Sequence, residues 1–353
     1  MTVTRTEAHA PAVRCAAPHV LGRCRALVRP ALARAVEQLH PWVGEMASYS
    51  FGWCEPGGAP ADHPGGKGIR QALAVLGAEA AGAPGQAGVD AAVAVELVHT
   101  FSLLHDDIMD GDATRRRRPT VWKAYGTGPA VLAGDALYAL AVETLAVSGG
   151  GPDAIRMLSG ALGDLVSGQA DDLLFAARPW TGPERVRPEE YRTMAEHKTG
   201  ALLGCAAALG ALSGGAPPET VTALERAGRH LGIAFQVVDD VLGIWGDPSV
   251  TGKPVHGDLR ERKKTLPVLA ALDAPGPVAR RLAAFLESAE AVDDAAAAHA
   301  AVLIDEAGGR TAALAEAADH IASVERALTG VPLAAAAANE LRLLMDHLVD
   351  RDV

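Results

Sequence analysis

The sequence is short of aromatic residues, of cysteines and of basic charge, and each shortage excludes a class of protein. Its 353 residues carry 32 Lys and Arg against 43 Asp and Glu, which gives a formal net charge of −11. Nonspecific nucleic-acid binding needs a basic surface, so we expect no nucleic-acid partner. With 49% hydrophobic and 21% charged residues, the chain has the composition of a folded protein with a large core.

Cysteines are few and scattered, at Cys15, Cys24, Cys54 and Cys205, and no pair has the CxxC spacing of zinc or redox sites. Such isolated cysteines are typical of a reduced, cytoplasmic protein. No apolar run of about 18 residues is free of charge, Gly and Pro, which predicts no membrane span. The first residues lack a basic stretch followed by an apolar core, so we expect no signal peptide.

Strand patterns are also scarce. Aromatic residues make up only 4% of the chain, and no alternating pattern is longer than a few residues. Ala and Leu dominate, and both are strong helix formers, whereas sheets prefer aromatic and β-branched residues. We therefore predict an all-α fold, with a flexible, Pro-containing tail over residues 1–18 and a single helical domain over residues 19–353.

Gly- and Pro-rich breaks divide the helical patterns. The first pattern, near 19–50, is broken at Pro30 and Pro41, and Asp90 is a candidate N-cap for a later helix. The stretch 111–126 is predicted as a loop. Further helices are expected near 129–147, 152–177, 188–212, 218–243, 265–271, 276–288, 293–305, 310–328 and 333–350.

One apolar helical pattern ends in the sequence HDDIMD, residues 105–110. Asp106 and Asp110 are four residues apart and so share one helical face, with Asp107 beside them. Such carboxylates repel each other unless a cation is bound, and their hard oxygen atoms favour Mg²⁺ together with substrate phosphates. The alternative is a solvated acidic helix end. It fits less well, because the negative end of the helix dipole disfavours aspartate.

A second apolar pattern ends in the same way, in FQVVDDVLGIWGD at residues 235–247. It places Asp239 and Asp240 side by side, with Asp247 further on. Carboxylates on facing helices are a known way to build a metal site in a helical bundle. Two acidic helix ends that face one cavity are therefore one interpretation, and surface charge is the other.

Basic residues flank the first acidic motif. GGKGIR places Lys67 and Arg70 after a Gly-rich loop, and TRRRRPT places a run from Arg115 to Arg118 just after the aspartates. Arginine binds phosphate oxygens bidentately and lysine acts as a point charge, so a bound polyanion would explain the pattern. A solvated loop with balanced charge is the alternative. Taken singly, Lys198, Lys253 and Lys263 indicate only surface lysines.

Together these motifs resemble the trans-isoprenyl diphosphate synthases, also called polyprenyl synthetases. The matching segments follow that family's order across residues 65–267. They read GGKGIR, ELVHTFSLLHDDIMD, TRRRRPT, GDALYALA, GQADDL, HKTG, FQVVDDVLGIWGD and GKPVHGDLRERKKTLP. The resemblance implies an all-α bundle, the isoprenoid synthase type I fold, around a deep central cavity, and a homodimer.

The resemblance also implies a reaction. Isopentenyl diphosphate would condense head-to-tail with an allylic diphosphate, namely dimethylallyl, geranyl or farnesyl diphosphate. Mg²⁺ held by the two acidic motifs would help the allylic substrate to lose pyrophosphate. The isopentenyl double bond would attack the resulting cation, and a proton would leave to the departing pyrophosphate. A dry, apolar cavity would keep water from quenching the cation.

Roles follow by motif position, again as implied by the resemblance. The expected metal ligands are Asp106, Asp110 and Asp239, with Asp107 and Asp240 in supporting or water-mediated positions. The allylic diphosphate or its leaving group would be held by Arg115, Lys198, Thr199, Gln236, Lys253 and Lys263. The isopentenyl diphosphate would be held by Lys67, Arg70, His99 and Arg116.

Two positions depart from the family pattern. The second acidic motif has Gly243 where many members have a further aspartate, so one possible metal ligand is missing. The usual RRGxPT has Arg117 in place of its glycine, and this arginine would either tighten a phosphate contact or face solvent.

Product length is expected to depend on side chains just before the first acidic motif. Phe101, five residues before Asp106, lies roughly one helical turn deeper along the cavity wall, next to the small Ser102. An aromatic residue here, with no insertion in the motif, resembles short-chain members that stop at geranylgeranyl diphosphate. We expect that product. The alternatives are a farnesyl diphosphate synthase, a type I terpene cyclase, and a non-catalytic partner subunit of a prenyltransferase.

Overall fold

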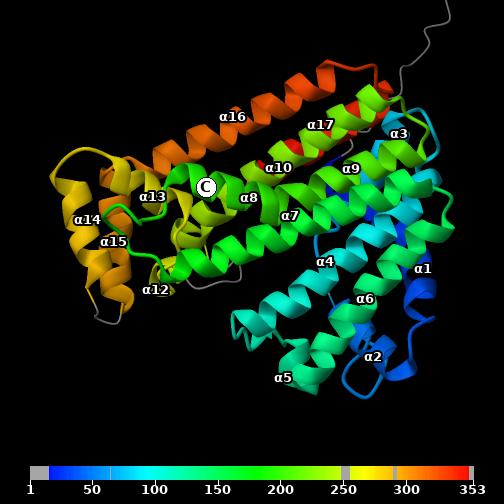
Figure 1. The fold of residues 1–353 in the computed structure, drawn as a ribbon, viewed down its shortest axis with the longest axis horizontal. Coiled ribbons are helices and arrows are strands. Elements are labelled where there is room, and N and C mark those ends of the chain that lie inside the picture. The colour runs from blue at the N-terminus through cyan, green and yellow to red at the C-terminus, as the bar shows by residue number, and fades with distance from the viewer. Residues whose placement is uncertain (1–15, 64, 248–254, 289–291, 350–353) are drawn as a thin grey trace, which may run out of the picture.

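The computed structural model describes residues 16–63, 65–247, 255–288 and 292–349, and within them the chain is a bundle of helices (Figure 1). This confirms the all-α prediction. In chain order the helices are α1 (Ala17–Val36), α2 (Pro41–Ser50), α3 (Ile69–Ala80), α4 (Val89–Met109), α5 (Val121–Tyr125), α6 (Thr127–Val147), α7 (Gly151–Ala177), α8 (Pro188–Ala195), α9 (Ala201–Ser213), α10 (Pro218–Trp245), α12 (Gly257–Arg260), α13 (Leu266–Asp273), α14 (Pro277–Glu287), α15 (Asp294–Glu306), α16 (Gly309–Thr329) and α17 (Ala335–Val349).

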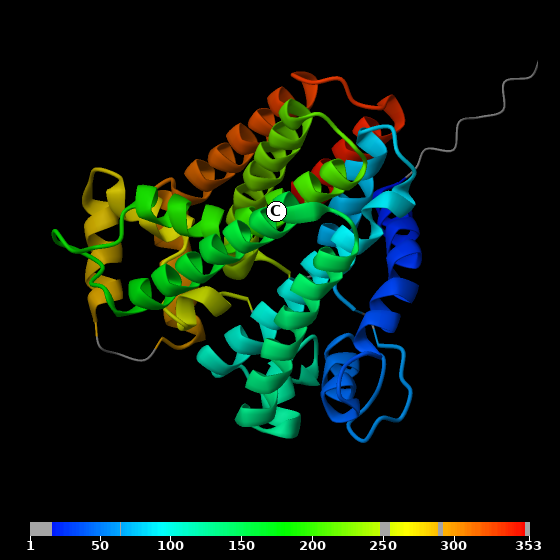
Figure 2. The ribbon, with the colours of Figure 1, turned by 45° about the vertical axis from the view of Figure 1, so that its right-hand side comes forward.

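Helices α3, α4, α9 and α10 form the centre of the bundle, with α3 on α9 and α10 on both α9 and α16 (Figures 1 and 2). Small residues allow α3 and α9 to approach closely. A Cβ atom added to Gly210 would lie 2.0 Å from the carbonyl oxygen of Ala74, and one added to Gly77 would lie 2.4 Å from that of Ala207. The two backbones are therefore in direct contact, which explains why this Ala-rich sequence packs well with few large side chains.

Helix α4 connects this core to the candidate site. Its first half, from Val89 to Val98, is buried against α3 and α9, and its length also packs on α6. The polar residues of the HDDIMD motif come only in its last turns, ending at Met109. The apolar half therefore fixes the direction in which the acidic end points.

Two local predictions were wrong. Pro30 lies inside α1 rather than breaking it, because Val28 and Leu32 beside it are buried in the core and offset the lost backbone hydrogen bond. Gly88, not Asp90, is the N-cap of α4, because a 3₁₀ turn leads directly into the helix and leaves Asp90 in the first turn.

The N-terminal tail predicted for residues 1–18 falls mostly outside the described residues. Helix α1 begins at Ala17, two positions before the expected domain start. The domain boundary therefore stays a prediction.

The stretch 111–126, predicted as a loop, contains a hairpin followed by the short helix α5. Strand β1 (Thr114–Arg115) pairs antiparallel with β2 (Arg118–Pro119). The two linking residues, Arg116 and Arg117, have φ angles of 52° and 63°. Both values are left-handed, as in a type I′ hairpin turn, where Asn and Gly are usual. The sequence gives no hairpin signal because arginine occupies both turn positions.

By length and composition, two helical segments could cross a membrane: Gly85–Met109 and Thr127–Val147. The search for an uninterrupted apolar run of about 18 residues did not identify them. The first is mainly the core helix α4, and 72% of its most apolar window is buried in the bundle. The second is α6, with 39% buried. It packs on α4 and leaves Val131 and Leu132 exposed. The absence of a membrane span stays a prediction.

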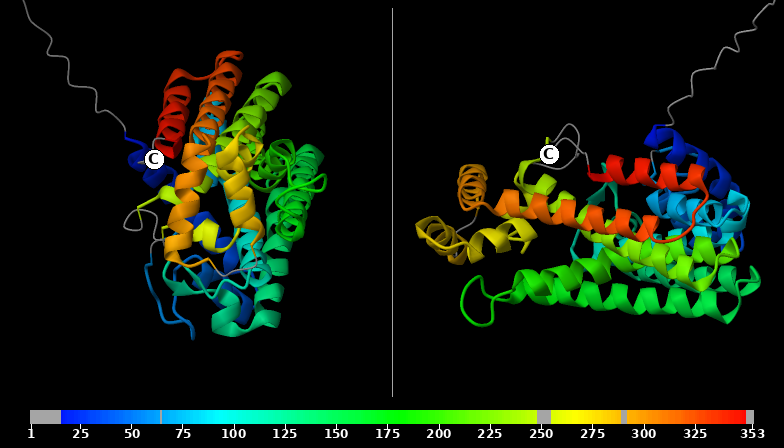
Figure 3. Two further views of the ribbon diagram at one scale, coloured as in Figure 1. Left: turned by 90° about the vertical axis from the view of Figure 1, so that its left-hand side faces the viewer. Right: turned by 90° about the horizontal axis from the view of Figure 1, so that it is seen from above.

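A smaller core lies at the other end of the molecule, where α14 and α15 are farthest from α1 (Figures 1 and 3). Its buried residues include Ile244 at the end of α10, Leu259 of α12, Leu282 of α14 and Ile304 of α15. This packing holds α12 beside the end of α10 that carries the second acidic motif.

Candidate active site

The acidic ends of α4 and α10, the start of α3, the π-helical turn Glu196–Gly200 and the hairpin enclose a cavity of about 880 Å³. A second cavity of about 430 Å³ adjoins it, and His99, Arg115 and Arg116 line both. Most of the predicted site residues line the larger cavity: Lys67, Arg70, His99, Asp106, Asp110, Arg115, Arg116, Lys198, Thr199, Gln236 and Asp239.

The two acidic motifs face the same space. Asp106 and Asp110 come from α4 and Asp239 from α10, and all three line the larger cavity. Burial is the main reason why the pKa of Asp106 is raised to about 6, and the negative charge of Asp110 adds to it, against the opposing charge of Lys198. Burial likewise raises the pKa of Asp110. These carboxylates therefore lie where a bound cation would relieve an unfavourable charge.

Lys198 and Thr199 reach the cavity from the π-helical turn that joins α8 to α9 without a break. The turn packs closely on α7, because a Cβ atom added to Gly168 would lie 2.3 Å from the backbone nitrogen of Lys198. The Lys198 ammonium pairs with Asp172 of α7. Sequence reasoning gave no role to Asp172, although it belongs to the GQADDL segment. Such π-turns are frequent at functional sites.

Gln236 is held on two sides. Its Oε1 accepts a hydrogen bond from Thr199 Oγ1 at 2.9 Å, and its Nε2 donates to Asp240 Oδ1 at 3.1 Å. Asp240 itself accepts from the Tyr191 hydroxyl and from the Leu266 backbone nitrogen. Burial, followed by the charge of nearby Asp258, raises the pKa of Asp240 to about 7.

Asp107 and Asp240 do not line the larger cavity, so each acts on the site through a neighbour. Asp107 is buried and accepts a hydrogen bond from Nε of Arg115 at 2.7 Å. It therefore fixes the guanidinium of Arg115, as Asp240 fixes the amide of Gln236. The supporting or water-mediated positions expected for both at the metal stay a prediction.

The position of Gly243 in the second acidic motif is filled from another segment. A Cβ atom added to Gly243 would lie 1.9 Å from a carboxylate oxygen of Asp258. Asp258 precedes Lys263, whose Nζ lies 3.9 Å from Asp258 Oδ1 and 2.8 Å from Glu261 Oε2. Lys263 does not line the larger cavity in this structure. Lys253 lies outside the described residues.

The basic side of the cavity holds Lys67, Arg70, His99 and Arg116. Arg70 Nη1 donates to His99 Nε2 at 3.2 Å. Burial, with the positive charges of Arg70 and Arg116, holds the pKa of His99 well below its usual value. His99 is therefore neutral, and because Nε2 accepts from Arg70, its ring proton is on Nδ1.

A buried acid, Glu96, lies one helical turn before His99 and lines both cavities. Sequence reasoning missed it. Burial raises its pKa, and the charges of Arg70, Arg116 and Arg25 oppose that rise. Glu96 is close enough to these arginines to balance part of their charge. Its position three residues before His99, on the same face of the helix, was the sequence pattern that could have predicted its place in the site.

Phe101 lines neither of the two cavities, and its ring packs toward α6. Its ring centroid lies 4.8 Å from that of His105 and 5.9 Å from that of Tyr138. The neighbouring Ser102 lines the larger cavity, together with Leu165 of α7. The role of Phe101 in product length stays a prediction.

The comparisons with known proteins identify the family of the chain. Residues 60–302 match the family model of the polyprenyl synthetases. The chain is 45% identical over 339 residues to a (2E,6E)-farnesyl diphosphate synthase of Mycobacterium tuberculosis, covering 94% of this chain and 92% of that protein. It is 46% identical over 298 residues to a geranylgeranyl diphosphate synthase of the same species, covering 82% of each.

Solved structures show the same fold. A polyprenyl synthetase from Streptomyces coelicolor A3(2) superimposes with a TM-score of 0.87 and 46% identity, covering 94% of this chain and 98% of that one. A geranylgeranyl pyrophosphate synthase from Corynebacterium glutamicum, complexed with calcium and isoprenyl diphosphate, has a TM-score of 0.77 and 30% identity, covering 94% and 96%.

An all-α bundle in which two aspartate motifs and a group of basic residues line one cavity defines the isoprenoid synthase class. Within that class, the family match and these relatives show that the chain belongs to the polyprenyl synthetase family. It is a trans-prenyltransferase.

Proposed function

We propose that the protein condenses isopentenyl diphosphate with an allylic diphosphate in the presence of Mg²⁺, and that its main product is geranylgeranyl diphosphate. One observation carries the proposal. One cavity is lined both by aspartates from α4 and α10 and by Lys67, Arg70 and Arg116. Two diphosphates, one bound through a metal and one bound directly by cations, match that division.

The donor set fits Mg²⁺. Asp106, Asp110 and Asp239 offer hard carboxylate oxygens from two helices, and burial raises the pKa of Asp106, a rise that a bound cation would counteract. Calcium, present in the Corynebacterium glutamicum complex, shares the preference for oxygen ligands. When bound, Mg²⁺ would stabilise the negative charge that develops on the departing diphosphate.

The chain's own residues would then act on the allylic diphosphate. Arg115, oriented by Asp107, and Lys198 supply positive charge to its oxygens. Gln236 keeps one Nε2 hydrogen free for the diphosphate, because its other groups bind Thr199 and Asp240. Groups held in place before the reaction stabilise developing charge without reorganising.

Lys67, Arg70 and Arg116 would bind the isopentenyl diphosphate, with neutral His99 donating from Nδ1. Leu103, Leu165 and Phe235 also line the larger cavity. These apolar residues would exclude water from the allylic cation. The proton released after carbon–carbon bond formation would pass to the departing pyrophosphate.

The metal proposal is tested with Asp106→Asn. We expect turnover to fall by on the order of 10²-fold or more, and the Mg²⁺-dependent rise in melting temperature with inorganic pyrophosphate to disappear. Asp153→Asn, an exposed change on α7, is the matched control and should keep both. Near-normal turnover and an intact Mg²⁺ response in Asp106→Asn would refute the metal assignment.

The product is tested by mass spectrometry after incubation with Mg²⁺, isopentenyl diphosphate and each allylic starter. We expect a twenty-carbon chain from dimethylallyl, geranyl and farnesyl diphosphates. The two mycobacterial relatives, named for fifteen- and twenty-carbon products, are about equally similar, so identity alone does not choose. A product that stops at fifteen carbons would make the protein a farnesyl diphosphate synthase.

Two other candidates predict different results. A type I terpene cyclase would consume farnesyl diphosphate without isopentenyl diphosphate, and it would not need the basic wall of Lys67, Arg70, His99 and Arg116. A non-catalytic partner subunit would show no turnover alone. The complete first acidic motif and the carboxylate of Asp258 beside Gly243 favour an active enzyme.

We further propose a homodimer in the cytoplasm. Helices α6 and α7 pack together and both expose large apolar side chains. On α6, Val131, Leu132 and Tyr138 are exposed, and on α7, Val166, Leu173 and Leu174. Each set contains one pair seven residues apart, Val131 and Tyr138 on α6 and Val166 and Leu173 on α7, so each helix exposes an apolar stripe. A second copy of the chain would cover such a surface.

A further inference from the structure

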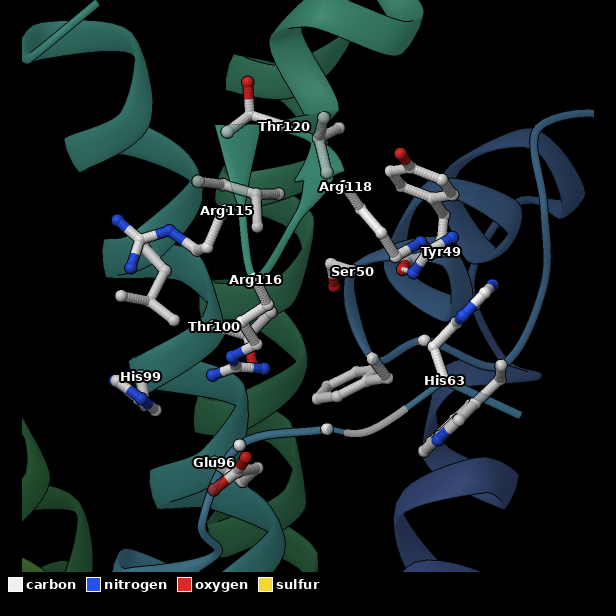
Figure 4. A pocket seen from close by; sticks show the side chains of 18 of the residues that line it. Tyr49, Ser50, His63, Glu96, His99, Thr100, Arg115, Arg116, Arg118 and Thr120 are labelled. Carbon is white, nitrogen blue, oxygen red and sulfur yellow. Dashed lines mark hydrogen bonds between the residues drawn. The ribbon is translucent and has the colours of Figure 1, made fainter. Parts of the chain in front are cut away.

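The hairpin that carries Arg115 and Arg116 is held by Arg118, a residue to which the family motifs give no role. Figure 4 shows Arg118 directed from the hairpin toward Tyr49. Its Nη1 donates to the Tyr49 carbonyl at 3.2 Å, and its Nη2 donates to the Cys54 carbonyl at 3.0 Å. Nη2 also lies 3.3 Å from Glu55 Oε2. One guanidinium therefore binds three groups of the segment from Tyr49 to Glu55.

Tyr49 adds a second contact to the same strand. The Arg118 guanidinium lies 4.2 Å from the centroid of the Tyr49 ring, a cation–π geometry. The Tyr49 hydroxyl donates to the carbonyl of Pro119 at 2.8 Å. Tyr49 is only 3% exposed, so these contacts are shielded from water. Strand β2 is thus fixed at both of its residues.

The segment that Arg118 binds is itself well ordered by internal contacts. Cys54 and Pro60 form a β-bridge, and the backbone nitrogen of Ala61 donates to the Trp53 carbonyl at 2.8 Å. His63 pairs with Glu55. We call residues 51–63 the closed loop; shortly after it comes GGKG, which contains Lys67. The closed loop therefore connects the residues that Arg118 binds to the segment that carries Lys67.

Arg116 of the hairpin and the segment that carries Lys67 meet at Gly66. A Cβ atom added to Gly66 would lie 2.9 Å from Nη2 of Arg116, so the Arg116 guanidinium packs directly on this glycine. Arg25 Nη2 donates to the Gly66 carbonyl at 2.7 Å. The separation between Arg116 and Lys67, the next residue, thus depends on how the hairpin is placed against the closed loop.

The hairpin also needs outside support. Arg116 and Arg117 hold left-handed φ angles of 52° and 63°, which non-glycine residues adopt only under constraint. Such conformations persist where the surroundings over-determine them. The contacts of Arg118 and Tyr49 to strand β2 provide that constraint. Without them, the turn would relax and Arg116 would leave its place on Gly66.

We propose that Arg118 is a positioning residue for isopentenyl diphosphate: by binding Tyr49, Cys54 and Glu55 it holds Arg116 beside Lys67. This inference rests on the proposed function, in which Arg116 and Lys67 bind that substrate. It assigns Arg118 an effect mainly on one substrate. Among the residues proposed for the allylic diphosphate, Arg115 shares the hairpin but is held directly by Asp107 of α4, and Asp106, Asp239 and Lys198 lie on other elements.

The test compares purified full-length Arg118→Met with the unsubstituted protein in steady-state assays with Mg²⁺. We expect the KM for isopentenyl diphosphate to rise by roughly tenfold, because several hydrogen bonds from a charged group are lost. The KM for farnesyl diphosphate should change by less than about twofold. Arg156→Met, the same change at an exposed position of α7, is the control and should alter neither.

Two further variants separate positioning from general stability. Arg118→Lys keeps the charge and one donor contact. Its KM for isopentenyl diphosphate should therefore lie between that of the unsubstituted protein and that of Arg118→Met. Tyr49→Phe keeps the ring but loses the bond to Pro119, and should raise the same KM by a smaller factor. If Arg118→Met does not fold, the KM of Tyr49→Phe for isopentenyl diphosphate tests the proposal in its place.

Equal changes in both KM values, or no change in the isopentenyl diphosphate KM of the deciding variant, would overturn the proposal. Failure of the proposed function would look different, because the unsubstituted protein would then give no chain elongation. Elongation by the unsubstituted protein with unaltered kinetics in Arg118→Met would refute only the role of Arg118.

Discussion

At the scale of single residues, Gly243 and Asp258 complement each other. The carboxylate of Asp258 occupies the volume that a side chain at position 243 would need. It lies near enough to Asp240 to raise the pKa of that residue and within 3.9 Å of Lys263 Nζ. A carboxylate from another segment thus lies close to the place that an aspartate at position 243 would take.

This arrangement predicts that restoring the family motif would damage the protein. Gly243→Asp should lower the free energy of unfolding by about 1–3 kcal/mol, because the new side chain meets Asp258, and it should lower turnover as well. Chemical denaturation and steady-state assays measure the two effects. The double variant Gly243→Asp with Asp258→Ala removes the collision and should recover stability. A stable, more active Gly243→Asp would contradict the packing described above.

Arg117 gives a second prediction at this scale, of opposite sign. Its left-handed φ of 63° costs a non-glycine residue about 1–2 kcal/mol, while glycine costs about 0.5–1 kcal/mol in unfolded-state entropy. Arg117→Gly should therefore raise the free energy of unfolding by up to about 1 kcal/mol, as measured by urea denaturation. Arg156→Gly, in the interior of α7, should lower it by a similar amount. Destabilisation by Arg117→Gly would show that the arginine side chain itself stabilises the turn.

At the scale of elements, α10 and α16 meet through a histidine pair. His230 Nδ1 and His320 Nδ1 lie 2.9 Å apart, so one ring donates and the other accepts, and at least one is neutral. Burial is the main cause that lowers the pKa of both rings. The charged groups that act on them are Glu196, Arg226, Arg326, Glu316, Arg192 and Asp319.

The pair predicts a pH dependence of stability. Because the folded pKa values lie below the unfolded value of about 6.5, the unfolded chain binds more protons as the pH falls below that value. The pair's contribution to the free energy of unfolding should therefore decrease from pH 7.5 to pH 5.5, whereas the raised pKa values of Asp106 and Asp240 act in the opposite direction. His320→Gln should remove the pair's contribution, so that the free energy of unfolding in denaturation curves falls less, or rises more, as the pH is lowered. An unchanged slope in His320→Gln would mean that the pair does not contribute.

Elements also show what the sequence could and could not predict. The helices and the two acidic motifs were predictable, because apolar periodicity and carboxylate spacing are local signals. Asp172, which pairs with Lys198, and Asp258, which fills the position of Gly243, act on residues far away in sequence, so no local pattern reveals them. The turn at Arg116 and Arg117 was missed because tertiary contacts, not turn propensity, hold it.

At the scale of the whole molecule, the apolar stripes of α6 and α7 predict a change in association. Leu132→Glu places a charge on one stripe, where Leu132 is 50% exposed. We expect light scattering to report a dimer for the unsubstituted chain and a monomer for Leu132→Glu, because burying an unpaired charge is costly. Glu143→Gln on α6 is the control for a changed charge. A monomeric unsubstituted chain would remove the dimer from the proposal.

The direct backbone contact of α3 with α9 has a further consequence for redesign. Neither Gly77 nor Gly210 can gain even a methyl group, so these two positions are closed to variation. Phe101, by contrast, meets His105 and Tyr138, rings that can be made smaller. Selection for longer prenyl chains should accordingly accept smaller residues at Phe101 or Tyr138 and leave Gly77 and Gly210 untouched.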